Sequence, residues 1–168
     1  SKKYKLKIIF DAACAFGNYY RNQSLTKFGD IAVYSFNGNK NFTTGGGGLI
    51  CTESNKYYNY SKQYSENGKK NTYEYIMSGF NLKMNSINAA LGLAQIKKFK
   101  IIKNNKIKIS NTYKKNLKNI EIFNCKYPWG KYLPWMNFCL IKNKNYLKKI
   151  IKKLKKSKIM VNNFWIPM

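Results

Sequence analysis

Three short apolar runs stand out in the first third of the chain: Leu6 to Phe10, Ile31 to Phe36 and Leu49 to Thr52. Each is bounded by small or turn-forming residues and contains β-branched side chains, a pattern that predicts buried strands. The first run is followed by Asp11. The pattern therefore predicts a carboxylate at the C-terminal end of a strand, which is where open α/β sheets bind their ligands.

A helical pattern begins at Asn85 and Ser86, which are suited to cap a helix. Apolar residues then recur at helical spacing at Ile87, Ala90, Leu91, Ala94, Phe99, Ile101 and Ile102. This spacing predicts one long helix, and Asn104–Asn105 is the point at which it could break. We expect these strands and this helix to belong to an α/β fold, with the strand that precedes Asp11 in an open sheet.

The composition changes beyond this helix, because residues 81–168 are rich in lysine and contain one acidic residue, Glu121. Phe138 to Ile141 predicts a further strand, and Tyr146 to Lys156 predicts an amphipathic helix with lysines outward. Its expected inward positions are Leu147, Ile150, Ile151 and Leu154. We expect a domain boundary near residue 105.

The net charge of +26 would suit a nucleic-acid partner, because clustered basic side chains neutralise phosphates. However, Arg21 is the single arginine among the 32 basic residues, whereas phosphate and base readout favours the bidentate arginine side chain. Residues with A/T-rich codons dominate the sequence, which indicates codon bias. We therefore expect no nucleic-acid partner, and lysines scattered over the surface.

The residue types exclude several kinds of chemistry. The chain has no histidine and six acidic residues, which excludes Ser-His-Asp and Cys-His nucleophiles and leaves little for paired carboxylates. Cys14, Cys51, Cys125 and Cys139 form no CxxC pair, so no metal site is expected. Without a signal peptide or an apolar run of ~18 residues, the cytoplasm is the default location and no membrane association is expected.

The segment from Tyr34 to Gly48 carries the most chemistry. Ser35 and Lys40 place a hydroxyl and an amine five residues apart, and four consecutive glycines end the segment. Glycine permits positive φ and close approach of a ligand to the backbone. A Walker A loop is excluded because asparagines flank the lysine. On spacing alone, a glycine-rich hairpin with an exposed lysine is the open alternative.

Asp11 adds a carboxylate at the end of another predicted strand. Pyridoxal 5'-phosphate (PLP) requires a lysine for a Schiff base, an acid beside its pyridine nitrogen, and hydroxyl and backbone N–H groups for its phosphate. Lys40, Asp11 and Ser35 provide these groups. A PLP site is compatible with them, although aspartates at strand ends also commonly cap turns.

These residues resemble the DegT/DnrJ/EryC1/StrS family of sugar aminotransferases, which have the type I PLP fold. The resemblance rests on five blocks in the family's order and spacing: Asp11-Ala12-Ala13, Phe28-Gly29-Asp30 with Ser35-Phe36 and Lys40, Thr43-Thr44 with Gly45–Gly48, Gly79-Phe80-Asn81-Leu82-Lys83-Met84, and Asn88-Ala89-Ala90-Leu91-Gly92. It is dense over residues 8–100 and thinner afterwards. Within the family, the segment around Lys40 is most similar to the branch that aminates UDP-linked 4-keto-6-deoxy sugars for legionaminic-type sialic acids.

The resemblance implies a role for each matching residue. Lys40 would form the Schiff base with PLP and then move protons, Asp11 would pair with the pyridine nitrogen, and Ser35 would bind the cofactor phosphate. Asn81 would reach the phosphate bound by a neighbouring subunit, so that a homodimer builds the active site. Cys14 stands at a further cofactor-binding position, beside the ring hydroxyl.

Three positions depart from the family pattern. Cys14 replaces the usual Gln, His or Glu, Phe10 replaces an acid, and Lys83 stands where arginine is usual. A thiol is a weaker hydrogen-bond partner than an amide, which affects the tuning of the ring hydroxyl.

The resemblance also implies a longer parent protein, because family members are roughly twice this length, consistent with two domains. Residues 1–104 would be the C-terminal part of the large PLP-binding domain with its connecting helix, and residues 105–168 part of an α+β small domain. The isolated chain would then expose a large apolar surface and tend to aggregate.

The expected reaction moves an amino group, from glutamate, to the keto group of a nucleotide-linked keto-deoxy sugar, for surface polysaccharide or sialic-acid-like sugar synthesis. A truncated or decayed non-catalytic homologue and a basic nucleic-acid-binding protein are the rival hypotheses.

Overall fold

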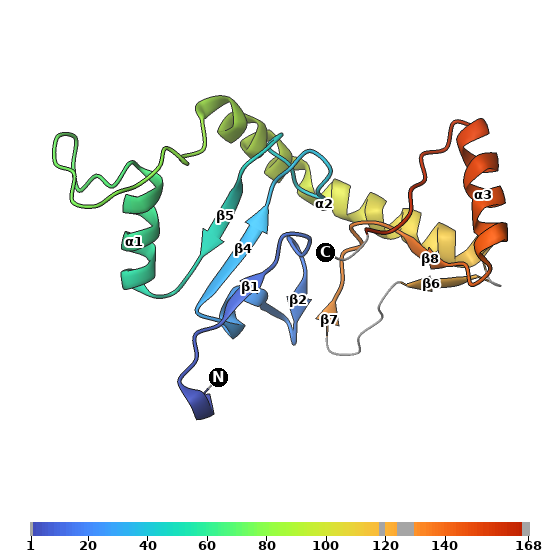
Figure 1. Cartoon of the computed structure of the whole chain (residues 1–168), viewed down its shortest axis with the longest axis horizontal. Coiled ribbons are helices and arrows are strands. Elements are labelled where there is room, and N and C mark those ends of the chain that lie inside the picture. Colours follow the sequence, from blue (N-terminus) through green and yellow to red (C-terminus); the bar gives the residue numbers. More distant parts are fainter. Residues whose placement is uncertain (1, 118–119, 124–129, 166–168) are drawn as a thin grey trace.

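The computed structural model describes residues 2–117, 120–123 and 130–165. Within them the fold is mixed α/β, which confirms the predicted class. The long helix α2 (Ser86–Asn116) runs from a central sheet at one end to a small two-stranded sheet at the other (Figure 1).

The central sheet has the strand order β1-β4-β5, and all three strands fall on the predicted apolar runs. They are β1 (Ile9–Asp11), β4 (Ile31–Ser35) and β5 (Gly48–Cys51). β1 pairs with β4 in parallel, and β4 pairs with β5 in antiparallel fashion. Because β1 and β4 are parallel, their C-terminal ends meet at the same edge of the sheet.

One face of this sheet, called here the closed face, carries the core. Residues opposite one another in neighbouring strands share a face, and Phe10, Ala32 and Cys51 are paired in this way. The buried cluster on this side consists of Ala12, Ala32, Tyr34, Phe36 and Phe42, packed against partly buried residues that include Phe10, Phe16, Met84 and Phe99. Its centre is aromatic, and burial raises the pKa of the Tyr34 hydroxyl.

The opposite face, called here the open face, carries the alternate residues of the same strands. Ile9 is 66% exposed, Ile50 51% and Val33 38%. The prediction that these strands are buried is therefore right for the closed face of β1 and β4 and wrong for the open face, which no described element covers. It is also wrong for β5, where Leu49 lies opposite Tyr34 on the closed face and is 43% exposed. The expectation that the chain exposes apolar surface agrees with this arrangement.

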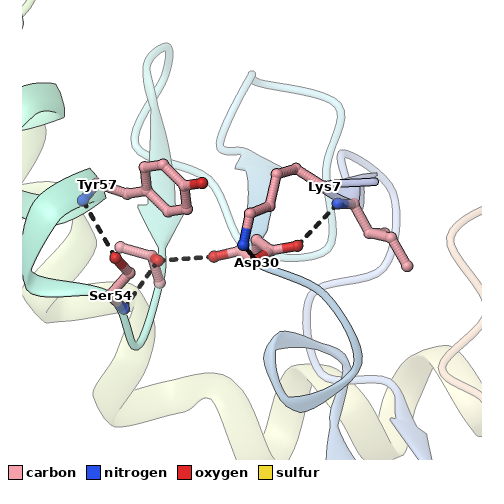
Figure 2. A network of polar contacts seen from close by, with 6 residues as sticks. Lys7, Asp30, Ser54 and Tyr57 are labelled. Carbon is pink, nitrogen blue, oxygen red and sulfur yellow. Dashed lines mark hydrogen bonds and ion pairs between the residues drawn. The ribbon is translucent and has the colours of Figure 1, made fainter. Parts of the chain in front are cut away.

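A polar network joins the starts of β1 and β4 to the end of β5 (Figure 2). The Asp30 carboxylate accepts hydrogen bonds from Lys7 Nζ at 3.0 Å and from the backbone N–H of Ile8 at 2.9 Å. These bonds lower the pKa of Asp30, with the Ile8 N–H as the largest cause, and the Asp30 carboxylate raises the pKa of Lys7. The backbone carbonyl of Asp30 accepts from Thr52 Oγ1 at 2.6 Å.

The same corner starts helix α1 (Asn55–Ser65). Ser54 is its N-cap, and its hydroxyl accepts a hydrogen bond from the backbone N–H of Tyr57 at 3.4 Å (Figure 2). The turn from β5 into α1 is thus fixed by hydroxyl caps of the kind that serine provides.

Helix α2 begins as predicted, with the Asn85 side chain accepting from Asn88 N at 2.9 Å. It continues through Asn104–Asn105 without a break. Gly92 of this helix packs against the loop between β4 and β5, because a Cβ there would lie 2.9 Å from the Thr44 methyl group. Ile87 and Ile101, which carry the apolar pattern of the sequence, are 82% and 63% exposed.

The remaining elements surround this framework. They are η1 (Lys2–Tyr4), β2 (Tyr19–Tyr20), β3 (Gln23–Ser24), η2 (Leu25–Phe28), β6 (Glu121–Phe123), β7 (Gly130–Lys131), β8 (Phe138–Leu140) and α3 (Lys144–Lys156). The predicted strand and amphipathic helix near the C-terminus are confirmed as β8 and α3, whose four expected inward residues are half-buried while its lysines are exposed. After α2 the chain returns, so that β7 pairs with β2 (Figure 1). Among the described helices, none is long and apolar enough to cross a membrane.

Candidate active site

The segment that carries Lys40 forms a closed loop, residues 36–47, directly after β4. The backbone N–H of Phe36 donates to Gly47 O at 2.9 Å, and Thr44 N donates to Phe36 O at 3.0 Å, so the two sides of the loop are tied together. At its tip, Lys40 N donates to Asn37 O at 3.0 Å. The loop thus presents Lys40 on a hydrogen-bonded turn rather than on an extended hairpin arm.

The glycine run has a steric purpose in this loop. Gly45 and Gly47 have φ angles of +81° and +82°, a region that side chains disfavour. A Cβ on Gly48 would lie 2.3 Å from the carbonyl oxygen of Tyr34. The glycines therefore allow the chain to turn tightly and to return against β4.

The Lys40 amine lies between two side chains from distant parts of the sequence. Its Nζ is 3.1 Å from Cys14 Sγ, and it lies over the ring of Trp135 at 4.0 Å from the ring centre. The structure thus brings together Lys40 and Cys14, two of the residues that the family pattern singles out. Trp135 was not predicted, because no local motif marks it and it lies far along the chain, beyond α2.

Asp11 and Ser35 lie on the open face of the sheet, at the ends of adjacent parallel strands. Asp11 is opposite Val33, and Ser35 is two residues further along the same strand. The Asp11 carboxylate accepts from Ala13 N at 3.0 Å, and Ser35 Oγ accepts from Asn37 N at 3.3 Å. Asp11 therefore caps a turn, as the alternative interpretation expected, while lying at the edge from which the Lys40 loop departs.

Asn81 lies apart from these residues, in the segment that follows α1. It forms an isolated bridge with Glu66, whose carboxylate is 3.4 Å from Lys83 Nζ. The expected contact between Asn81 and a cofactor bound by a second subunit stays a prediction.

The whole chain, residues 1–168, matches the model of the DegT/DnrJ/EryC1/StrS aminotransferase family. The chain belongs to this family. It is 35% identical over 122 residues to GDP-perosamine synthase of Escherichia coli O157:H7, a match covering 71% of this chain and 34% of that protein. It is 30% identical over 131 residues to the UDP-4-amino-4,6-dideoxy-N-acetyl-β-L-altrosamine transaminase of Helicobacter pylori, covering 76% of this chain and 35% of that one.

Solved structures of sugar aminotransferases share its fold. Helicobacter pylori PseC, an aminotransferase of pseudoaminic acid biosynthesis, superposes with a TM-score of 0.83 at 27% identity, covering 93% of this chain and 44% of PseC. The PMP-form of the sugar aminotransferase Spr1654 from Streptococcus pneumoniae superposes with a TM-score of 0.86 at 21% identity, covering 96% of this chain and 46% of that one. The predicted type I PLP-dependent transferase fold is confirmed. The chain spans between a third and a half of the length of these proteins.

The donor set of the site fits PLP. Lys40 offers a primary amine at a fixed turn, Asp11 a carboxylate, and Ser35 a hydroxyl, all at the edge where β1 and β4 end. The space beside the loop is open, because a Cβ on Gly38 or on Gly45 would meet no atom within 4 Å. An aldehyde that carries a ring nitrogen and a phosphate finds a chemically matched group for each of these three functions.

Proposed function

We propose that this chain provides the lysine-bearing part of a PLP-dependent aminotransferase that acts on a nucleotide-linked keto sugar. The observation that carries the proposal is the placement of Lys40 on a closed loop beside Cys14, at the sheet edge that also bears Asp11 and Ser35. Membership of an aminotransferase family supports the reaction class. Because the chain spans less than half of its relatives, the activity of the whole protein is part of the proposal.

Each residue of the chain then has a defined task. The Asp11 carboxylate would hold a proton at the pyridine nitrogen of the cofactor, the Ser35 hydroxyl would bind its phosphate, and Lys40 Nζ would hold the cofactor and move protons. When bound, PLP supplies an electron sink for the carbon that bears the amino group. Cys14 Sγ lies beside Lys40 Nζ and orients the amine.

The substrate class follows from relatives that act on sugars linked to different nucleotides. Their names include GDP-perosamine synthase, a dTDP-4-amino-4,6-dideoxy-D-glucose transaminase and a UDP-linked altrosamine transaminase. We propose a nucleotide-linked 4-keto-6-deoxy sugar as acceptor, with a UDP-linked sugar of a sialic-acid-like pathway first among them, and glutamate as donor. A homodimer would complete the site, with Asn81 reaching the partner's cofactor.

The proposal is tested by Lys40→Ala in purified protein incubated with PLP. We expect the visible absorbance of lysine-bound cofactor to disappear, while far-UV circular dichroism and the melting temperature stay unchanged, because half-exposed Lys40 contributes little to the core. The matched control is Lys56→Ala in α1, which removes another exposed lysine, outside the loop, and should leave the spectrum intact.

Retention of the absorbance band by Lys40→Ala would assign the cofactor to another lysine. A chain that binds PLP through Lys40 but transfers no amino group to any nucleotide-linked keto sugar would favour the decayed homologue. Salt-dependent binding of DNA without a cofactor spectrum would favour the basic nucleic-acid-binding protein.

Cys14→Gln tests the departure from the family pattern. We expect cofactor affinity to be preserved or raised, since an amide is a better hydrogen-bond partner for a ring hydroxyl than a thiol. The measurement is a spectrophotometric PLP titration. A severe loss of affinity would mean instead that the site is packed around the thiol.

A further inference from the structure

The short segment from Leu133 to Trp135 lies directly against the lysine loop, although more than ninety residues separate them. Asn41 Nδ2 donates to Pro134 O at 3.2 Å, and Trp135 Nε1 donates to Asn39 O at 2.8 Å. The residues on both sides of Lys40 are thus tied to this segment. Trp135 also lies over the Lys40 amine, so the three consecutive loop residues 39–41 all contact this segment.

The segment is itself firmly placed. Leu133 is 1% exposed, and its backbone N–H donates to Asn18 Oδ1 at 2.5 Å. Lys106 Nζ of α2 lies 3.5 Å from the carbonyl oxygen of Trp135, and Trp165 stacks on the Trp135 indole with ring centres 5.6 Å apart. The indole that meets Lys40 therefore has support from α2, from the turn after β1 and from a second tryptophan.

We propose that Trp135 is a positioning residue for Lys40: its indole face holds the amine against Cys14, at the edge where the cofactor would bind. This inference rests on the proposed function for its purpose, whereas the contact itself is formed by residues of this chain. A lysine side chain has four rotatable bonds and loses much conformational entropy when its end is fixed. A tryptophan face attracts an ammonium group and covers it from one side, which restricts the side chain without forming a bond that must later break.

The test measures how often Lys40 leaves the ring, in cofactor-free protein. The purified chain is labelled briefly with an N-hydroxysuccinimide ester of acetate at fixed pH, and acetylation of each lysine is quantified by peptide mass spectrometry. Two variants are compared, Trp135→Leu and Trp135→Phe. Both lack the indole N–H and both keep an apolar side chain, so they differ mainly in whether an aromatic face remains.

We expect Trp135→Leu to raise the labelling rate of Lys40 about two- to fivefold, the range that corresponds to a cation–π contact at a partly exposed site. Trp135→Phe should restore a rate near that of the unmodified protein. Tyr75→Leu is the matched control, because Lys69 Nζ lies over the Tyr75 ring at 5.2 Å. It should raise labelling of Lys69 and leave Lys40 unchanged.

Equal Lys40 labelling in the Leu and Phe variants would overturn the proposal, whether both match the unmodified protein or both exceed it. A PLP titration separates this result from the proposed function. If Trp135 positions Lys40, Trp135→Leu should also weaken the absorbance of lysine-bound cofactor more than Trp135→Phe does. If the unmodified protein shows no such absorbance, the proposed function fails while the labelling result still decides the role of Trp135.

Discussion

The two faces of the central sheet are built from the same three strands but have opposite surroundings. On the closed face, Phe42 is 6% exposed and its ring lies 4.8 Å from Phe16 and 4.6 Å from Phe36, centre to centre. On the open face, the apolar side chains of Ile9 and Ile50 are more than half exposed. Alternation along a strand assigns residues to faces, but only packing decides which face is a core.

The difference bears on function because Asp11 and Ser35 lie on the open face. The closed face supplies rigidity, since β4 is anchored there by Ala32 and Tyr34, which are 0% and 6% exposed. The opposite side of the same strands presents the polar groups proposed to bind the cofactor. A strand that is fixed from one side can thus hold functional groups on the other.

The largest difference between the two faces should appear when one apolar residue on each face is replaced. Phe42→Ala should lower the free energy of unfolding by about 3–5 kcal/mol, the usual cost of removing a buried aromatic side chain. Ile9→Thr, at a position 66% exposed, should change it by less than about 0.5 kcal/mol, because it keeps the β-branch and removes little buried surface. Urea denaturation followed by circular dichroism measures both.

Similar losses for the two variants would mean that the open face is covered in solution. Sedimentation velocity on the same samples would then show whether a second copy of the chain covers it. In that case the loss of stability would also depend on protein concentration.

Much of the fold could be predicted from local patterns. The three strands of the central sheet follow apolar runs, Asn85 caps α2 as expected, and α3 has the expected inward and outward sides. The face of α2 that contacts the sheet could not be read from its apolar residues. Of the predicted apolar positions, Phe99 packs on the core whereas Ile87 and Ile101 are exposed. The close approach itself occurs at Gly92, which the apolar pattern did not mark.

The candidate site was predictable where its residues lie in family motifs, as Asp11, Ser35 and Lys40 do. The 3.1 Å proximity of Cys14 to Lys40 agrees with the grouping that the motifs implied. Trp135 could not be found in this way. It reaches Lys40 because the chain turns back after α2 and β7 pairs with β2, a long-range arrangement that no local pattern encodes.

A substitution in the glycine run tests how closely β5 packs against β4, the central strand of the sheet. Gly48→Ala should lower the free energy of unfolding by about 1–3 kcal/mol, because its Cβ would lie 2.3 Å from Tyr34 O and must displace backbone. Gly38→Ala is the matched control in the same loop, since its Cβ meets no atom within 4 Å. Thermal denaturation of the pair gives the difference, and equal melting temperatures would contradict the close packing of β5 on β4.

A smaller effect on stability, but a visible one on solubility, is expected from the open face. The double substitution Val33→Thr and Ile50→Thr keeps β-branched side chains while removing exposed apolar surface from neighbouring, paired positions. We expect weaker self-association with little change in the unfolding midpoint. Light scattering over a range of protein concentrations measures this, and unchanged association would exclude the open face as its cause.

The smallest effect concerns the polar corner where Asp30 joins Lys7, outside both faces (Figure 2). The pKa of Asp30 is lowered from 3.8, so its contribution is present above pH 3.8 and is lost as the pH falls through its lower folded value. The pKa of Lys7 is raised from 10.5, so its contribution is present below pH 10.5 and is lost as the pH rises through its higher folded value. The contribution of this ion pair to stability should therefore be constant between these limits. Asp30→Asn should reduce the decline in melting temperature that is measured between pH 5 and pH 2. It should also make the melting temperature less sensitive to salt, because salt screens an exposed ion pair and the variant no longer has this pair. An unchanged acid profile in Asp30→Asn would assign the decline to other carboxylates.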